Sequence, residues 1–194
     1  MNNKLVVLVA ESCAGKDTVL KVLVDKYKMR RVVSHTTRPI RKNEIDGIDY
    51  HFISQQKFME MESQGKFVET REYNTIQDGE PTVWYYGVTQ EEVCLDGGNA
   101  VIILDIQGLQ HMEEYLGRKN MLSFYLRVDQ EERLRRAKAR GDNMDEVLRR
   151  LADDKIKFAD AERVVDLTIY NRNGLLSVED IAWIINERVK NERL

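Results

Sequence analysis

The apolar residues of the chain gather in short runs separated by longer polar stretches. The most compact run is Leu5–Val9, in which five consecutive residues are apolar with no polar alternation. Such a run is typical of a strand in a parallel sheet, because helices cover both faces of that kind of sheet. Further apolar runs lie at 32–33, 100–106, 122–128 and 164–170, the first of them short. Most runs precede a helical pattern, which favours parallel pairing through right-handed crossovers and predicts a three-layer α/β fold.

The helical segments show recognisable starts. Asp129 followed by Glu132, and Ser177 followed by Asp180, have the spacing of a capping box and predict two helix N-termini. Apolar residues at helical spacing then predict the buried faces of the first and the last helix. These residues are Val19, Leu20, Val22, Leu23 and Tyr27 in the first helix, and Ile181, Ile184, Ile185 and Val189 in the last.

Two segments do not follow the alternation of strand and helix. The segment 34–87 is polar, carries both prolines of the chain and is too long for a simple connection, which indicates an inserted substructure. The segment 133–157 is rich in Arg and Lys around Gly141 and lies between two predicted core strands. A charged segment of this kind is either a solvated helical surface or a binding site for anions.

A turn of small residues follows the first predicted strand. Gly15 and Lys16 stand where a phosphate-binding loop, usually G-x-x-x-x-G-K-[ST], has its second glycine and its lysine. Ala10 replaces the first glycine, and Asp17 replaces the hydroxyl residue that normally holds Mg²⁺. In such a loop the backbone N–H groups face the phosphates and the lysine reaches the outer ones. The segment predicts a nucleotide site, with an ordinary strand-to-helix turn and a surface lysine as the alternative.

Composition narrows the class of protein. The 194 residues suit one domain with a substantial core, and 42% hydrophobic with 32% charged residues is typical of a soluble globular protein. A net charge of −3 gives no general attraction to nucleic acid or to a membrane surface, so neither is expected as a partner. No long apolar stretch or signal-peptide pattern occurs, and Cys13 and Cys94 form no disulfide framework, so we expect a cytoplasmic protein.

The insertion carries candidate chemistry of its own. Arg38 and Arg41 lie three residues apart beside hydroxyl residues, and Tyr50 follows, a combination suited to a dianionic phosphate. Glu69 lies in an apolar neighbourhood, and Tyr86 offers another phenol. A carboxylate accepts two hydrogen bonds side by side, as the N1–H and the 2-amino group of guanine would donate.

These residues form a pattern that resembles the guanylate kinase family, the P-loop enzymes that move a phosphoryl group from ATP to GMP. The resemblance rests on Ser34-x-Thr36-Thr37-Arg38-x-x-Arg41-x-x-Glu44-x-x-Gly47-x-Asp49-Tyr50-x-Phe52, which is similar to the family's GMP-binding signature. It extends in order over the whole chain, through the Asp105-x-Gln107-Gly108 turn and the arginine-rich segment to a final strand ending at Asn171.

The resemblance implies a fold and a division of the chain. The expected fold is an α/β/α P-loop kinase core with a five-stranded parallel sheet, a small mixed β GMP-binding insertion and a helical lid. The core would comprise 1–33, 88–132 and 159–194, the insertion 34–87 and the lid 133–158. The oligomeric state stays open.

The resemblance also implies roles for individual residues. The ATP site would be formed by Ser12, Cys13, Ala14, Gly15, Lys16, Asp17, Thr18 and Asn171. The GMP site would be formed by Ser34, Arg38, Arg41, Tyr50, Glu69, Tyr86 and Asp105. The catalytic cations would be Lys16, Arg136, Arg140 and Arg150, with Arg149 as the alternative to Arg150. Mg²⁺ would be held at Asp17 and Asp105, although Asp17 is also a plain acid at a helix start.

Several departures from the family pattern keep other functions open. Besides Ala10 and Asp17, Cys13 replaces a loop glycine, which should restrict the loop backbone. Val88 stands where a Ser or Thr helps to read guanine, and the connection 74–84 is long. One alternative is a P-loop kinase for another phosphorylated acceptor, such as a different nucleoside monophosphate or a ribose bisphosphate. The other is a non-catalytic, protein-binding module, although such modules typically lack the loop lysine and the lid arginines.

Overall fold

A computed structural model describes residues 3–42, 44–77 and 79–192. The chain divides into two compact units, which are described separately below. The first unit joins 1–31 to 97–194, and the second comprises 32–96. The second unit therefore begins and ends outside the insertion expected at 34–87.

The first unit is built on a five-stranded parallel sheet with the strand order β2-β7-β1-β8-β9. Its strands are β1 (Leu5–Val9), β2 (Arg30–Arg31), β7 (Ala100–Leu104), β8 (Met121–Val128) and β9 (Leu167–Asn171). All five residues of β1 are buried, in agreement with the unbroken apolar run that predicted a strand covered on both faces.

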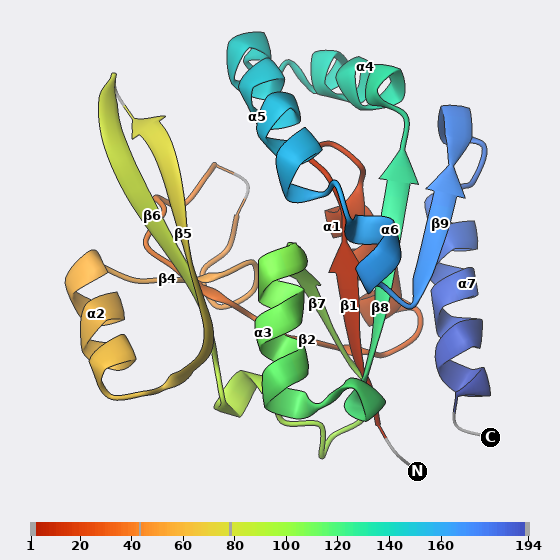
Figure 1. Cartoon of the computed structure of the whole chain (residues 1–194), viewed down its shortest axis with the longest axis horizontal. Helices are drawn as coiled ribbons and strands as arrows, with labels where there is room; N and C mark the ends of the chain where they lie inside the picture. Colours follow the sequence, from red (N-terminus) through yellow and green to blue (C-terminus); the bar gives the residue numbers. More distant parts are fainter. Residues whose placement is uncertain (1–2, 43, 78, 193–194) are drawn as a thin grey trace. The chain divides into compact units, whose positions relative to one another are not determined.

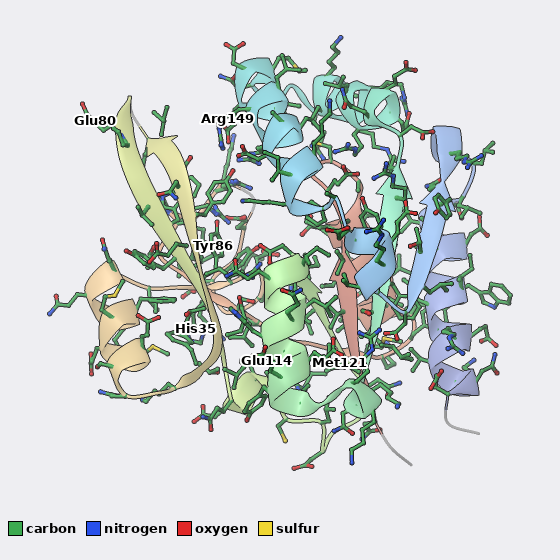
Figure 2. The ribbon with its side chains drawn as sticks, viewed as in Figure 1. His35, Glu80, Tyr86, Glu114, Met121 and Arg149 are labelled. Atoms are coloured by element: carbon green, nitrogen blue, oxygen red, sulfur yellow. The ribbon has the colours of Figure 1, made fainter. Side chains whose placement is uncertain are left out.

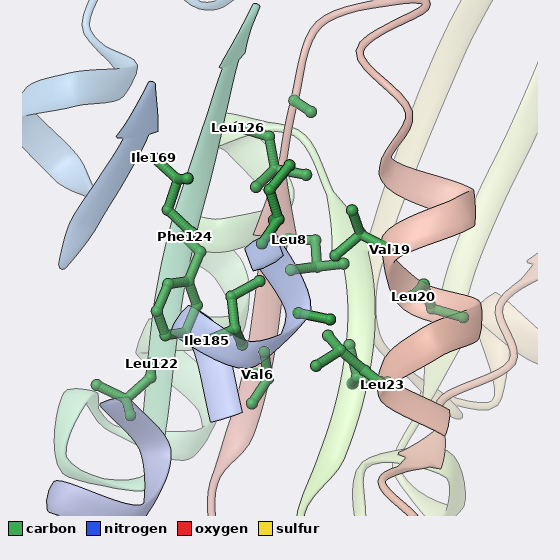
Figure 3. Packing of buried hydrophobic residues seen from close by; sticks show 14 of the residues in the cluster. Val6, Leu8, Val19, Leu20, Leu23, Leu122, Phe124, Leu126, Ile169 and Ile185 are labelled. Atoms are coloured by element: carbon green, nitrogen blue, oxygen red, sulfur yellow. The ribbon is translucent and has the colours of Figure 1, made fainter. Parts of the chain in front are cut away.

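Helices lie on both faces of this sheet, which confirms the predicted three-layer core (Figure 1). On one face, α1 (Lys16–Asp25) and α7 (Val178–Asn191) pack together over the strands. Figure 3 shows this layer, in which alternate residues of the strands meet apolar side chains of both helices. The labelled side chains are Val6, Leu8, Val19, Leu20, Leu23, Leu122, Phe124, Leu126, Ile169 and Ile185. On the other face, α3 (Ile106–Leu116) contacts β1, β7 and β8.

The arginine-rich segment forms two helices, as its charge pattern around Gly141 suggested. α4 (Gln130–Arg140) ends at Gly141 in the left-handed conformation, and α5 (Met144–Lys157) begins at Asn143, whose side chain accepts from the backbone N–H of Asp145 and of Glu146. A short helix α6 (Ala161–Val164) follows α5, and the described residues also form three 3₁₀ turns. The turns are η1 (Glu91–Val93), η2 (Arg118–Asn120) and η3 (Arg172–Gly174).

The second unit contains a four-stranded mixed sheet with the order β4-β3-β6-β5. Its strands are β3 (His35–Thr36), β4 (His51–Phe52), β5 (Phe67–Gln77) and β6 (Glu80–Thr89), and its helix is α2 (Gln55–Ser63). β5 and β6 pair antiparallel, from Phe67 opposite Thr89 to Gln77 opposite Glu80. The described residues of the long connection expected at 74–84 therefore belong to a β-hairpin. Tyr73 and Trp84 stack across this hairpin with ring centroids 6.2 Å apart.

The structure corrects three local predictions. The strand expected at 32–33 lies instead at Arg30–Arg31, where it pairs with β7. The run 164–170 begins too early, since its first residues close α6 before β9 starts at Leu167. Asp129 does occupy the N-cap of α4, but its side chain makes no capping hydrogen bond. The capping box of Ser177 and Asp180 is confirmed.

Candidate nucleotide-binding sites

The turn after β1 adopts a tight loop whose end becomes the N-terminus of α1. Gly15 has φ +92°, and the backbone N–H groups of Thr18 and Val19 donate to its carbonyl oxygen. Cys13 also has a positive φ, at +64°, which costs a non-glycine residue about 1 kcal/mol or more. The sequence predicted that Cys13 would restrict the loop backbone. In the structure, Cys13 adopts a conformation that glycine would adopt more easily. Lys16 is the first residue of α1 and is half-buried.

The structure brings one of the expected lid arginines directly to this loop. Arg136, on α4, donates from Nη1 to the carbonyl oxygen of Ala14 at 2.9 Å. The same nitrogen lies 3.2 Å from where a Cβ on Gly15 would stand, so a side chain there would crowd the guanidinium. Glu132 accepts from Arg136 at 2.8 Å and also from Arg135. The hydrogen bonds from Arg135 and Arg136 lower the pKa of Glu132 to about 2.

Arg140 also reaches the loop. Its Nη2 lies 3.1 Å from the sulfur of Cys13 and 2.6 Å from a carboxylate oxygen of Asp142. The guanidinium therefore sits at the end of α4 with one contact to the loop and one to its own helix terminus.

The two candidates for a third lid arginine occupy adjacent positions on α5. Arg149, labelled in Figure 2, donates to Glu146 and to Asp153, each at 2.8 Å, whereas Arg150 donates to Glu146 at 2.7 Å. Hydrogen bonds from Arg149 and then Arg150 outweigh the effect of burial and lower the pKa of Glu146 to about 2. All of these hydrogen bonds go to acidic residues of α5 itself. The choice between the two arginines therefore stays a prediction.

The remaining residues expected near ATP lie around the same edge of the first sheet. Asp17 and Thr18 are exposed on the first turn of α1. Asn171, at the end of β9, is buried, and its side chain exchanges two hydrogen bonds with the backbone of Leu176. Asp105 caps α3 by accepting from the backbone N–H of Gly108 at 2.9 Å. Asp105 thus belongs to the first unit, whereas the other residues expected to bind GMP belong to the second.

The donors available for a metal are oxygen atoms. Within the described ranges no group of three or more His, Cys, Asp or Glu side chains could enclose an ion. Mg²⁺ usually takes only one or two carboxylates and completes its shell with water and substrate phosphates. An exposed Asp17 at the phosphate loop fits that pattern of binding.

In the second unit, the register of the sheet brings the expected acceptor residues to one face. Thr36 lies opposite Tyr86 in β6, and Tyr86 lies opposite Arg71 in β5. Glu69 lies two residues before Arg71 and opposite Val88. Directly opposed residues share a face, and side chains two apart along a strand share it too. The face therefore presents a phenol, a carboxylate and a guanidinium together.

Arg38 joins this face through aromatic contacts. Its guanidinium carbon lies 5.4 Å from the ring centroid of Tyr50, and the rings of Tyr50 and Tyr86 are 6.0 Å apart. Arg38 is 4% exposed and binds both oxygens of Glu44, at 2.7 and 3.0 Å. Glu44 also accepts from the backbone N–H of Arg41, so one carboxylate holds both arginine-bearing positions.

The other expected residues of the second unit flank this cluster. The side chain of Arg41 is exposed, and Ser34 is buried just before β3. The carbonyl oxygen of Ser34 accepts from the backbone N–H of His51, which fixes β3 beside β4. Ser34, Arg38, Tyr50, Glu69 and Tyr86 are therefore all parts of the same small sheet and its adjoining loops.

Arg71 is a site residue that the sequence reasoning missed. Its side chain forms an ion pair with Glu69, whose side chain has no exposed surface. The available signal was the spacing of two residues, which places both side chains on one face wherever the segment is a strand. Val88, opposite Glu69, is fully buried and supplies no hydrogen-bonding group.

The opposite face of the small sheet is packed with aromatic rings. Phe58 of α2 stacks on Phe67 with ring centroids 4.5 Å apart. His35 lies 4.6 Å from the ring of His51 and 5.7 Å from that of Phe67. Burial, and then the nearby charge of His51, lower the pKa of His35 to about 4. Figure 2 labels His35 and Tyr86, which come from neighbouring strands but belong to opposite faces.

Comparison with known proteins shows the family of the chain. The family model described as guanylate kinase matches residues 2–191. The chain belongs to the guanylate kinase family. A guanylate kinase of Wolbachia pipientis wMel is 34% identical over 192 residues, covering 96% of this chain and 91% of the relative. A guanylate kinase of Desulfotalea psychrophila is 31% identical and covers 98% of this chain and 92% of the relative.

A solved structure supports the same family assignment. The crystal structure of guanylate kinase from Anaplasma phagocytophilum has a TM-score of 0.73 with 25% sequence identity, and covers 99% of this chain and 87% of that one. The α/β architecture and the guanylate kinase resemblance expected from the sequence are thereby confirmed. No helix among the described residues has the length and apolar character needed to cross a membrane.

Proposed function

We propose that the protein transfers the γ-phosphoryl group of ATP to GMP, or to dGMP, by in-line displacement. Membership of the guanylate kinase family supports this activity. The observation that carries it is the sheet face that holds Arg38, Tyr50 and Tyr86 beside the buried Glu69. A guanidinium and two phenols suit a phosphate monoester, and a carboxylate suits the N–H edge of guanine.

The donor site in this proposal is the loop after β1. Its amides and Lys16 would hold the ATP phosphates at the N-terminus of α1. Arg136 and Arg140 already contact the loop, so they would neutralise charge on the transferred group without a large rearrangement. Arg150 is the third cation in the proposal. The helices α4 and α5 would also exclude water, which limits hydrolysis of ATP.

Asp17 is the proposed protein contact of Mg²⁺, with Asp105 as the second candidate. When bound, the ion would neutralise phosphate charge and orient the transferred group. We expect Asp17→Ala to raise the Mg²⁺ concentration needed for half-maximal activity. Asp25→Ala, at the other end of α1, is the matched control. An unchanged Mg²⁺ titration for Asp17→Ala would mean that Asp17 serves only as an acid at the helix start.

A coupled assay of ATP consumption tests the activity directly. GMP, dGMP, AMP, CMP and UMP are offered separately, and we expect turnover with GMP and dGMP. A preference for AMP or a pyrimidine nucleotide would instead support the alternative, a kinase for another acceptor. The apolar Val88, which stands where a Ser or Thr would help to read guanine, is the reason for that alternative. Turnover with none of the five would contradict the proposed activity. A cytoplasmic location is part of the proposal and rests on Cys13 and Cys94, neither of which forms a disulfide.

A further inference from the structure

Three charged side chains are buried beside the phosphate loop, and the reaction proposed above does not use them. Glu11 lies within the loop, Arg133 on α4 and Asp154 on α5. They are 4%, 3% and 7% exposed, respectively. Charged residues are almost never buried to this extent unless they are paired, so their partners explain their presence.

Arg133 is the centre of the group. Its Nη2 donates to a carboxylate oxygen of Glu11 at 3.1 Å, and its Nη1 lies 3.4 Å from both the carbonyl oxygen of Ser12 and a carboxylate oxygen of Asp154. Its Nε donates to the carbonyl oxygen of Val128 at 3.2 Å. One guanidinium therefore connects the end of β8, two loop residues and α5.

Asp154 completes the connection from the other helix. It accepts from the backbone N–H of Ser12 at 2.7 Å, the shortest hydrogen bond of the group. A loop amide that would otherwise be available to a phosphate is thus held by a carboxylate. The conformation of the loop at Glu11 and Ser12 is fixed by side chains from α4 and α5.

The charges also bear on the affinity for an anion. Glu11 and Asp154 place two carboxylates beside a loop proposed to bind the phosphates of ATP. Arg133 is paired with both, and Arg127 lies 3.8 Å from the second oxygen of Glu11. Loss of Arg133 would leave buried negative charge next to the anion, which is far more costly than the loss of a surface pair.

We propose that Arg133 is a positioning residue for the phosphoryl donor. It fixes the phosphate loop through Glu11, Ser12 and Asp154, and its positive charge offsets part of the carboxylate charge beside the loop. The inference rests on the proposed function in one respect, namely that ATP binds at this loop. It assigns no contact between Arg133 and the nucleotide.

The test compares ATP affinity with GMP affinity in five proteins. These are the wild type, Arg133→Met, Glu11→Gln, the double variant with both changes, and Lys138→Met as a control for the loss of a solvent-exposed cation from α4. Equilibrium binding of ATP in the presence of Mg²⁺ is measured together with the KM values for ATP and GMP.

We expect Arg133→Met to weaken ATP binding by about tenfold or more, because a buried pair loses one partner. The KM for GMP should change by less than about twofold, since additive effects are the rule for separate sites. The double variant should bind ATP more tightly than Arg133→Met, because it removes one of the two carboxylates that have lost Arg133 as a partner. Lys138→Met should match the wild type.

Equal losses of affinity for ATP and GMP in Arg133→Met would show a merely structural role and overturn the proposal. Wild-type ATP affinity in that variant would overturn it too. If Arg133→Met does not fold, Arg133→Lys replaces it, because this variant keeps the positive charge but cannot make all four contacts. Wild-type ATP affinity in Arg133→Lys would then overturn the proposal. If the wild type binds ATP but does not phosphorylate GMP, the proposed function is contradicted. The role of Arg133 is still tested in that case, because ATP binding to the wild type and to Arg133→Met can be compared without turnover.

Discussion

Glu69 shows how a single side chain depends on its neighbours. Its carboxylate is buried on β5 and paired with Arg71, which lies two residues along the same strand. The sequence predicted Glu69 from its apolar surroundings and from the family pattern. It did not predict Arg71, because the largely polar segment that forms β5 showed no apolar pattern from which to assign a strand or its register. Arg133 was missed for a similar reason, since its partners lie about a hundred residues away or at the far end of α5.

We expect Glu69→Gln to weaken discrimination between bases. The amide offers one acceptor and one donor in place of two acceptors, so it no longer matches both N–H donors of guanine. The KM for GMP should rise by about tenfold or more, and the ratio of kcat/KM for GMP to that for AMP should fall. Glu72→Gln, an exposed carboxylate on the other face of β5, is the control. Unaltered selectivity in Glu69→Gln would contradict the assignment of Glu69 to the base.

His35 makes stability depend on pH. Its folded-state pKa of about 4 lies below the ordinary 6.5, so between these values the unfolded chain binds more protons than the folded one. Stability should therefore fall as the pH drops from 6.5 to 4. The full shift corresponds to about 3 kcal/mol, and solvent screening at this half-buried site reduces the expected loss to about 1–2 kcal/mol.

Urea unfolding at pH 7 and pH 5 measures this effect. The difference in the free energy of unfolding between the two pH values should be smaller in His35→Phe than in the wild type. His111→Phe, a change on α3, should retain the pH dependence of the wild type. A His35→Phe variant with the full wild-type slope would assign the acid sensitivity to other groups.

At the scale of whole elements, prediction succeeded where an apolar pattern filled the element. β1, β7 and β8 were located from short apolar runs, and α7 from its capping box and apolar stripe. β2 was misplaced because its two residues, which pair with β7, are arginines and give no apolar signal. The N-cap of α4 was predicted from residue spacing. Spacing does not fix the side-chain rotamer that Asp129 would need to accept a capping hydrogen bond.

The helix α5 offers a test of the lid. Arg149 is held by two acids and Arg150 by one, so Arg150 has fewer interactions to give up when a phosphate arrives. We expect Arg150→Met to lower kcat by about a hundredfold or more, and Arg149→Met to lower it much less. Steady-state kinetics at saturating ATP and GMP would measure the difference. A larger loss in Arg149→Met would move the third lid cation to position 149.

The whole molecule divides its two proposed sites between two units with separate sheets. The larger sheet is parallel and was predictable, because buried parallel strands have the clearest apolar signature. The apolar pattern indicated only an inserted substructure here, since β3 and β4 have two residues each and no periodic pattern. The mixed β character of the insertion was expected from the family resemblance. Its chemistry was predictable before its structure, because the guanylate kinase signature lies within it.

This division predicts which amides each nucleotide protects from hydrogen exchange. A ligand stabilises the state that binds it, by about 2.7 kcal/mol at a concentration of about 100 Kd, so exchange through local opening at its site slows by about a hundredfold. GMP alone should slow exchange most in β3, β5 and β6, and ATP with Mg²⁺ should slow it most at the loop residues after Ser12. In Arg133→Met at the wild-type ATP concentration, the protection of the loop should weaken while the protection by GMP persists. If GMP protected the loop more strongly than β3, β5 and β6, the assignment of the GMP site to the second unit would be contradicted.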